Sequence, residues 1–320
     1  CKKDTEVEAV AQYSVPQAFS DDSNALTAVG GVYDELQGDN GYGIRISMYY
    51  PYDTDEGIVS GGIDNGRRGI GRYQLLLTNA ELSNPFRQLY RGLEKANLCI
   101  EQIPLMTQYS SGSASDQAIL KRLHGEALVL RAQYLYQLIL NWGDVPAPMV
   151  PAYKLADLFI PKSDRDSVYD QLLSDLQTAK GLLPWRTDAG ARSERITKGV
   201  AMALRARLAL FRGGYSLRSN GQMERRSDYL TYYNIAKQEC EELMARRDQH
   251  TLNPNYENIW RNVTSFTYDP QAEIIWEVGA GGGNSNSDSR MGNYDGPNLN
   301  NASRYGAGGG GIVMLPNYFY

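Results

Sequence analysis

The sequence predicts a mainly α-helical protein in which helical hairpins stack into a scaffold, with long irregular loops and a few short strands around it. Two observations carry this prediction. Apolar residues recur at spacings of three and four over five long segments, which is the period of one buried helix face. These segments also follow one another in pairs, and one stretch of eight residues occurs twice, as in a helical repeat.

Composition agrees with a folded chain and excludes two classes of protein. The 320 residues are 42% hydrophobic and 22% charged with a formal net charge of -5, so a sizeable core is expected. No apolar run approaches the roughly 20 residues that cross a bilayer. The acidic balance gives no attraction toward phosphate backbones, so we expect no nucleic-acid partner.

The first predicted helices follow from caps and periodicity. A Ser/Asp cap starts a helix over 21–36. Residues 38–71 are rich in Gly, Asp and Tyr and show neither the helical period nor the alternation of a strand. We therefore predict a long ordered loop there and treat it as a candidate site. The next helix begins at Asn84 and ends before Pro104, and its partner runs from about Leu120 to Trp142.

The pattern then repeats. Helices are predicted from Val168 to Leu183 and from Val200 to Phe211, and residues 125–132 and 199–206 are identical at five of eight positions. Small residues in the second copy allow two helices to approach closely. A fifth helix over 229–246 places one face toward the core, with Tyr232 or Tyr233, Ala236, Cys240 and Leu243 on it. Stacked hairpins of this kind predict a tetratricopeptide-like array.

After Asn253 the chain becomes irregular and rich in Asn, Gly and Tyr. One strand is predicted at 273–278, and eleven glycines fall between 279 and 311. We expect residues 254–320 to lie over the helices as loops within a single domain spanning 21–320. The sequence stops at Tyr320 without a cap or polar tail, so we expect that a C-terminal part is missing.

The first residue is Cys1 and not Met, followed by a polar stretch. A mature N-terminal Cys is what lipoprotein processing leaves, so we expect a lipid anchor on Cys1 and a tether over 1–20; the alternative is a chain that merely starts there. Cys99 and Cys240 fall in helical patterns and are interpreted as buried free thiols, a bridge between them being the alternative. The two His residues lie far apart, so no metal site is expected.

Five blocks, in this order, resemble one protein family: Cys1, residues 130–136 running into Trp142-Gly-Asp-Val-Pro146, 167–173, 197–210 and 272–277. They are similar to the SusD/RagB family of Bacteroidetes surface lipoproteins. The resemblance implies a SusD-like helical scaffold that extends well past residue 320. It further implies a place on the extracellular face of the outer membrane, capture of oligosaccharides or polysaccharides, and delivery to a SusC-like TonB-dependent transporter.

No enzyme is expected. The sequence holds no Gly-x-Ser-x-Gly elbow, no paired His and no phosphate-binding loop, and its glycine runs do not open a helix, so no cofactor is predicted either. Trp142, Trp185, Trp260 and Trp276 are expected to be structural, because they follow helix or strand periodicity or a helix end.

Sugar recognition needs an aromatic face beside planar polar groups that pair with hydroxyls. Two loop regions offer this mixture and give the candidate ligand-binding residues: Arg67, Arg68, Arg72 and Tyr73 in the first, and Arg290, Tyr294, Arg304 and Tyr305 in the second. Two alternatives remain open. The three arginines of the first region would favour the acidic termini of a peptide, and a scaffold that binds no small ligand is the third hypothesis.

Overall fold

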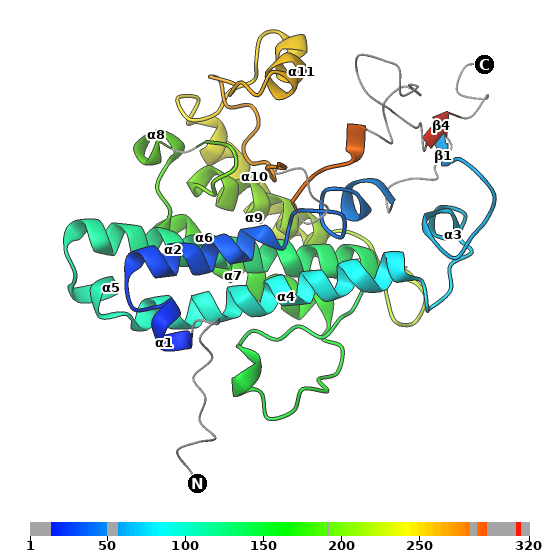
Figure 1. The fold of residues 1–320 in the computed structure, drawn as a ribbon, viewed down its shortest axis with the longest axis horizontal. Coiled ribbons are helices and arrows are strands. Elements are labelled where there is room, and N and C mark those ends of the chain that lie inside the picture. The colour runs from blue at the N-terminus through cyan, green and yellow to red at the C-terminus, as the bar shows by residue number, and fades with distance from the viewer. Residues whose placement is uncertain (1–13, 50–56, 191, 282–286, 293–311, 315–320) are drawn as a thin grey trace, which may run out of the picture.

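A computed structural model of the chain describes residues 14–49, 57–190, 192–281, 287–292 and 312–314. Most of the long helices lie side by side in one layer, and the irregular C-terminal part crosses over it (Figure 1). The helices are α1 Val15–Ala18, α2 Asp22–Asp34, α3 Arg67–Gly71, α4 Ala80–Gln102, α5 Thr107–Ser111, α6 Ala114–Trp142, α7 Arg165–Leu182, α8 Arg186–Ala189, α9 Lys198–Gly213, α10 Tyr229–Met244 and α11 Tyr256–Thr264. A π-helical turn covers Arg45–Tyr49, and 3-10 turns cover Ile103–Leu105 and Ala152–Lys154.

The short strands form two antiparallel pairs among the described residues. β1 Gly57–Val59 pairs with β4 Ile312–Met314, and Gly57 lies opposite Met314. β2 Ser216–Leu217 pairs with β3 Met223–Glu224 in a small hairpin between α9 and α10. The predicted fold class, mainly helical with a few short strands, is confirmed.

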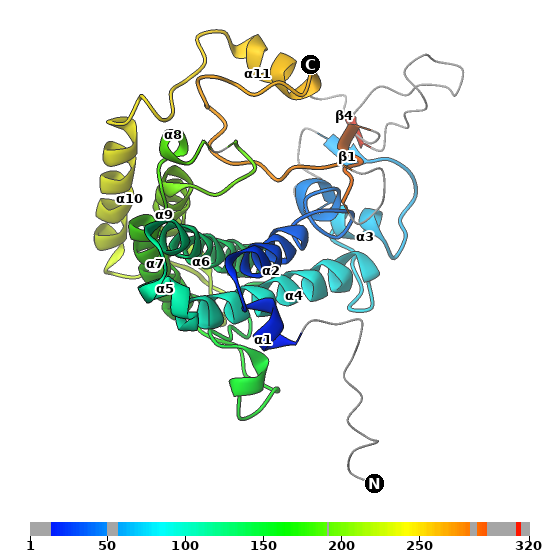
Figure 2. The ribbon, with the colours of Figure 1, turned by 60° about the vertical axis from the view of Figure 1, so that its left-hand side comes forward.

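Each long helix packs against the next one along the chain, in the order α4, α6, α7, α9 and α10, while α2 lies across α4 and α6 (Figure 2). The central helix α6 is buried over most of its length, from Leu120 to Ile139. One apolar cluster joins these helices, and Tyr134 and Leu135 at its centre are fully buried. The stacked hairpins therefore share a continuous core, as a helical repeat requires.

Caps explain where the helices begin and end. The side chain of Asp21 accepts a hydrogen bond from Asn24 N, and Ser113 forms a capping box with Asp116. Gly143 ends α6 at a φ of 75°, in the left-handed region that favours glycine. The prediction that the second helix starts at Asn84 is wrong by one turn, because Asn79 caps α4 and Pro85 lies inside it.

The internal repeat has a structural meaning. A Cβ added to Gly125 would lie 2.8 Å from Leu183 Cγ, and one added to the equivalent Gly199 would lie 2.6 Å from His250 Nε2. Both glycines therefore allow the following segment to approach closely. The repeat-equivalent arginines also act alike: Arg131 binds Asp175 of α7, and Arg205 binds Glu239 of α10.

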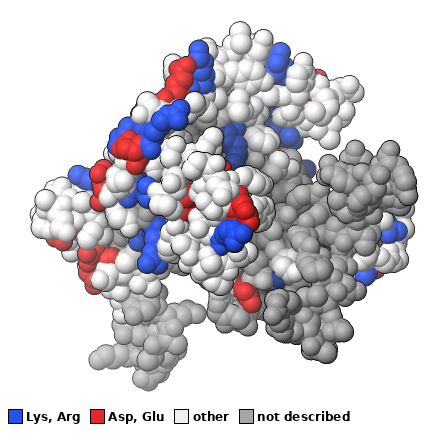
Figure 3. All heavy atoms as spheres, turned by 90° about the horizontal axis from the view of Figure 1, so that it is seen from above, with Lys and Arg blue, Asp and Glu red and all other residues white. Residues whose placement is uncertain are grey.

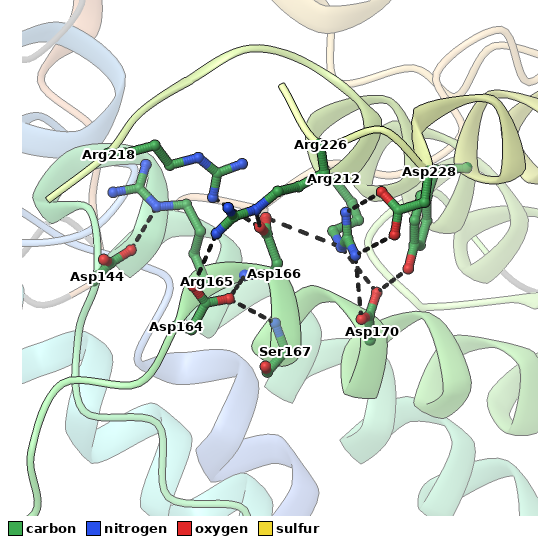
Figure 4. Close-up of polar contacts among 11 residues, drawn as sticks. Asp144, Asp164, Arg165, Asp166, Ser167, Asp170, Arg212, Arg218, Arg226 and Asp228 are labelled. Carbon is green, nitrogen blue, oxygen red and sulfur yellow. Dashed lines mark hydrogen bonds and ion pairs between the residues drawn. The ribbon is translucent and has the colours of Figure 1, made fainter. Parts of the chain in front are cut away.

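The densest charged cluster ties the second hairpin together (Figure 4). Asp166 accepts hydrogen bonds from Arg218 at 2.9 Å and from Arg226 at 2.7 Å, while Arg212 bridges Asp170 and Asp228. Burial of Asp166 acts to raise its pKa, but the hydrogen bonds from Arg226 and Arg218 outweigh it and hold the pKa below its ordinary value. These carboxylates are bound by arginine, so the cluster joins α7, α9 and α10 and the hairpin between them rather than serving as an acid–base pair.

Two predictions about buried faces are wrong. On α10 the buried residues are Ala236 and Glu239, and Cys240 is exposed. Ala236 is buried and Leu243 partly buried as predicted, but Glu239 is buried in place of Cys240 and pairs with both Arg205 and Lys180, which compensates for burying a carboxylate. Cys99 is buried as expected, and both thiols are free. Trp260, expected to be structural, is 61% exposed on α11.

The predicted strand at 273–278 is not a strand. Its residues run as an irregular segment over the helices, where Ile275, Trp276 and Val278 pack against the core. Glu277 N donates to Ser193 O at 3.0 Å, and Trp276 Nε1 donates to Glu194 O at 3.4 Å. The helical layer covers these apolar side chains, so no neighbouring strand is needed.

Candidate functional site

The irregular segment 272–280, drawn in orange in Figure 1, forms the wall of a two-part cleft on the helical layer. The two parts have volumes of about 540 Å³ and about 470 Å³. Both are lined by Arg192, Glu194, Tyr268, Glu277, Val278 and Gly279, and we call them together the Tyr268 cleft. Asn262, Val263 and Phe266 line the first part, and Leu26 and Tyr33 line the second.

A tight turn after α11 presents the aromatic side chains of the cleft. Phe266 and Ala272 adopt positive φ values of 55° and 50°, which are unusual for residues other than glycine. Asp269 holds the turn, because its carboxylate accepts hydrogen bonds from Gln271 N and Glu273 N at 3.2 Å each. Strained backbone of this kind gathers at functional sites. Phe266 is 93% exposed, so packing within the described protein does not explain its position.

His250 fixes the start of the same segment. Its Nδ1 donates a hydrogen bond to Ala272 O at 2.8 Å, and its side chain packs on Gly199. Burial lowers the pKa of His250 although the hydrogen bond to Ala272 O acts to raise it, so burial dominates and favours the neutral ring.

Tyr268 is held in one orientation by two charged neighbours. Its hydroxyl donates to Glu194 Oε1 at 2.7 Å and accepts from Arg192 Nη1 at 3.2 Å. The Arg192 guanidinium also lies 4.6 Å from the ring centroid. The hydrogen bond to Glu194 raises the pKa of Tyr268, so the hydroxyl stays protonated. The result is a partly exposed aromatic ring with fixed polar groups at its edge.

The charged side chains of the cleft are held by ion pairs or hydrogen bonds within the protein. Arg195 pairs with the buried Glu126 at 2.8 Å, and Glu277 accepts a hydrogen bond from the Ser193 hydroxyl. On the face in Figure 3, acidic and basic side chains are interspersed without a large field of one sign. An arrangement of paired charges, amides and exposed rings suits a neutral, hydroxyl-rich ligand better than a strongly charged one.

A second cavity of about 600 Å³ lies on the other side of the segment, and we call it the Trp276 cavity. Its polar lining includes Gln37, Tyr42, Gln133 and Glu273. Gln133 Nε2 donates to the Tyr42 hydroxyl at 2.5 Å, and burial raises the pKa of Tyr42. Gln133 and Tyr42 satisfy each other, and the described lining of the cavity presents no exposed aromatic turn like that of Phe266, so it carries a weaker argument for a ligand than the Tyr268 cleft.

The first predicted binding region lies elsewhere, around α3, away from α11 (Figures 1 and 2). Arg68 donates to Ser60 O at 2.6 Å and to Asp64 at 2.5 Å, and Arg72 donates to Gly61 O at 2.9 Å. Tyr73 is 85% exposed with a φ of 55°. Arg67 begins the helix, and neither it nor the other three lines the Tyr268 cleft. The geometry shows Arg68 and Arg72 bracing a loop, and a role of this region in binding stays a prediction.

Of the second predicted region, Arg290 alone falls within the described residues. Its backbone N donates to Gly43 O at 3.1 Å, and its guanidinium lies 3.3 Å from Asp39. Its neighbours Ser289 and Met291 line the Trp276 cavity. Tyr294, Arg304 and Tyr305 lie outside the described residues, as does Cys1.

The residues of the Tyr268 cleft were missed by the sequence analysis. Their signal was the run Phe266-Thr-Tyr-Asp-Pro270, which places two aromatic residues just before a turn. Nothing local in the sequence indicates that Arg192 and Glu194 lie beside this turn.

Two further features bear on function. Over the described residues, none of the helices combines the length and the apolar character that a membrane span requires. In the same part of the chain, no group of three or more His, Cys, Asp or Glu side chains is arranged to hold a metal ion.

Residues 69–210 match a SusD-like family model described as "Starch-binding associating with outer membrane". A curated relative, SusD-like protein P25 of Formosa agariphila, is 21% identical over 286 residues, which are 87% of this chain and 48% of the relative. The chain therefore spans about half the length of this relative.

Solved structures agree on the fold. A SusD homolog from Bacteroides thetaiotaomicron superposes with a TM-score of 0.78 at 22% identity, covering 93% of this chain and 55% of that one. Surface glycan-binding protein A from the same species, solved with laminarihexaose, gives a TM-score of 0.68 at 16% identity and covers 93% of this chain and 60% of that one. Residues 69–210 thus match the SusD-like family model, and over most of its length the chain shares the fold of solved SusD-like structures.

Proposed function

We propose that the chain captures a glycan and that the Tyr268 cleft is the place of capture. The observation that carries this proposal is the joint presentation of Phe266 and Tyr268 in a concave surface beside Arg192, Glu194 and Asn262. Aromatic rings cover the apolar face of a sugar ring, and planar polar groups pair with its hydroxyls. Because Tyr268 is already oriented by Arg192 and Glu194, little conformational freedom is lost on binding.

The comparisons support the ligand class. The matching family model is described as starch-binding, and one solved structure of the same fold is a surface glycan-binding protein in complex with laminarihexaose. Both descriptions concern glucose polymers without charge. The charged side chains of the Tyr268 cleft are already held within the protein, which suits such a ligand.

The wider setting is part of the proposal. The captured oligosaccharide or polysaccharide passes to a SusC-like TonB-dependent transporter, and a lipid on Cys1 holds the chain on the extracellular face of the outer membrane. Residues 1–20 serve as the tether and 21–320 as one binding domain. The family's association with the outer membrane supports this placement.

The test is calorimetric titration of the chain lacking Cys1 against laminarin and starch oligosaccharides, host and plant glycans, and a peptide pool. Phe266→Ala and Tyr268→Ala are each expected to weaken glycan binding about tenfold, since removing one stacked ring costs about 1.4 kcal/mol. Phe159→Ala is the matched control, because Phe159 is also 93% exposed but lies on the loop before α7. Binding of peptides alone, or glycan binding indifferent to both cleft variants, contradicts the proposal.

A further inference from the structure

A cavity of about 880 Å³ lies at the C-terminal end of α6, and we call it the Arg218 cavity. It shares no lining residue with the Tyr268 cleft or the Trp276 cavity. Its walls come from the loop before α4 and the start of that helix, the last turn of α6, the start of α7 and the β2–β3 hairpin. The cavity therefore lies where segments distant in the sequence meet.

Arg218 brings two unpaired hydrogen-bond donors to this cavity. It lies in the loop of the β2–β3 hairpin, is 9% exposed, and donates through Nη1 to Asp166 Oδ2 at 2.9 Å (Figure 4). Its Nε and Nη2 are buried and have no hydrogen-bond partner among the described residues. Buried donors are nearly always paired, because an unpaired one costs free energy. A ligand that supplies an acceptor at this position recovers that free energy.

The two unpaired nitrogens form the edge of a guanidinium that binds carboxylates. Nε and Nη2 point the same way, so they can donate two parallel hydrogen bonds to one carboxylate. Other arginines of the chain use this edge on a carboxylate at distances of 2.6 to 3.0 Å, as in the pairs Arg131–Asp175, Arg246–Asp248 and Arg261–Glu257. Among the described residues, no carboxylate occupies the same edge of Arg218.

The rest of the lining favours an anion with an apolar body. Lys162 and Arg165 line the cavity together with Arg218, against the single carboxylate of Asp144, which Arg165 binds at 2.6 Å. Lys162 is exposed at the rim. The apolar part of the lining includes Leu75, Leu77, Leu82, Phe86, Leu140 and Leu217. An apolar wall beside a cationic corner suits a ligand that carries a carboxylate at one end of an apolar group.

We propose that the Arg218 cavity binds a hydrophobic carboxylate, whose oxygens accept hydrogen bonds from Arg218 Nε and Nη2 and whose apolar body lies against Leu140 and Leu217. The carboxylate supplies the acceptors that the buried nitrogens lack, and Lys162 adds attraction at the rim. A free hydrophobic acid and the carboxyl end of a peptide present the same group, so the experiment includes both. The site is separate from the Tyr268 cleft and does not depend on glycan capture.

The experiment is calorimetric titration of the chain with two matched pairs of probes at neutral pH. One pair is octanoate and octanamide. The other is an acetylated tetrapeptide ending in leucine and phenylalanine, with a free carboxylate or with a C-terminal amide. At least one acid is expected to bind about tenfold more tightly than its amide, because the amide cannot accept two charge-assisted hydrogen bonds from Arg218. The pair that shows this difference identifies the source of the carboxylate.

Two variants locate the bound acid. Arg218→Lys keeps a positive charge beside Asp166 but removes the two-donor edge, and it should weaken binding of the acid about tenfold and leave the amide unchanged. Leu140→Glu leaves the charged cluster intact and places a carboxylate in the lining that repels the acid. Its matched control is Leu210→Glu, because Leu140 and Leu210 are 48% and 52% exposed and Leu210 lies outside all three sites. Circular dichroism verifies that each variant is folded.

Three results overturn the inference. If wild type binds each acid no better than its amide, the Arg218 edge does not hold a carboxylate. If neither acid binds at all, the cavity is not a site for this ligand class. Equal losses in Leu140→Glu and Leu210→Glu would place the bound acid elsewhere on the surface. Glycan binding is expected to stay unchanged in all these variants, so the two sites are tested separately.

Discussion

Buried arginines pair with carboxylates on the neighbouring helix and so hold adjacent helices together. Arg131 is 5% exposed and donates to Asp175 at 3.0 and 2.7 Å, and its other hydrogen bonds go to Asn97 and the Met149 carbonyl. A buried pair gains little over an apolar pair, but removing one partner leaves an uncompensated charge. The same logic holds at the repeat-equivalent Arg205.

Asp175→Ala is therefore expected to lower the free energy of unfolding by about 3 to 5 kcal/mol, because it strands the Arg131 guanidinium. Urea denaturation followed by circular dichroism measures the change. The control is Glu241→Ala, which removes the exposed pair with Lys237 at 3.7 Å and should cost under about 1 kcal/mol. Comparable losses in the two variants would contradict the role of the buried pair.

His124 makes the fold sensitive to acid. Burial, aided by the charge of Arg131, lowers the pKa of His124 to about 4, and its Nδ1 is hydrogen-bonded to the Tyr109 hydroxyl at 3.0 Å. Between about pH 6.5 and pH 4 the unfolded chain binds a proton at this position that the folded chain does not. The contribution of His124 to stability is therefore complete above pH 6.5 and falls by up to about 3 kcal/mol as the pH drops toward 4. The test measures the free energy of unfolding of wild type and His124→Asn by urea denaturation between pH 4 and pH 6.5. If the free energy of unfolding falls equally in both proteins as the pH drops, His124 is not the cause.

At the scale of elements, glycines decide how closely helices approach. A Cβ on Gly92 of α4 would lie 2.2 Å from the Tyr134 ring of α6, whereas one on Gly181 of α7 would meet nothing within 4 Å. Tyr134 is fully buried and donates to Val32 O, so it has no room to move.

Gly92→Ala is expected to destabilise the protein by about 1 to 3 kcal/mol through overpacking. Gly181→Ala is expected to stabilise it by up to about 1 kcal/mol, because alanine favours the helix and meets no neighbour. Thermal unfolding of both variants gives the comparison. The same sign of change in the two would show that helix propensity and not close packing governs these positions.

The long helices were predictable because periodicity and caps are local signals. The helix from Asp21, the end of α6 at Trp142, the end of α9 within two residues of Phe211 and the eight-residue repeat were all predicted. Helix α11 was not predicted. It has only nine residues and none of them is buried, so its short apolar pattern is a weak signal. The strand expected at 273–278 is wrong because a short apolar run indicates that a segment is buried and not which partner buries it.

Non-local pairings were out of reach of the sequence. β1 and β4 lie more than 250 residues apart along the chain, and neither has a turn signal that points to the other. The burial of Glu239 in place of Cys240 depends on Lys180 and Arg205, which belong to two other helices. Such features are set by tertiary contacts that a single-sequence pattern does not contain.

At the scale of the whole molecule, the candidate site exists only because three distant segments meet. The loop after α8 supplies Arg192 and Glu194, the turn after α11 supplies Phe266 and Tyr268, and the segment after it supplies Glu277. Aromatic side chains beside arginine were expected in loops where the sequence shows them next to one another, at residues 67–73 and 290–305. Arg192 and Tyr268 are 76 residues apart and meet only through folding, so a local pattern in the sequence does not reveal them.

Because the Tyr268 cleft spans these segments, ligand binding is expected to stabilise the whole fold. At a free glycan concentration of 100 times the dissociation constant, the gain is about 2.7 kcal/mol. A thermal unfolding scan should show a higher Tm for wild type and Phe159→Ala with glycan than without. For Phe266→Ala at the same glycan concentration the increase should be clearly smaller, and an undiminished increase would place the ligand elsewhere.

The most direct test of the account is a crystal structure of the chain with a bound oligosaccharide from the series that calorimetry selects. The account predicts sugar rings in the Tyr268 cleft, with one ring against Phe266 and hydroxyls within hydrogen-bond distance of Arg192 or Asn262. Sugar bound at Arg72 and Tyr73, or in the Trp276 cavity with the Tyr268 cleft empty, would contradict it.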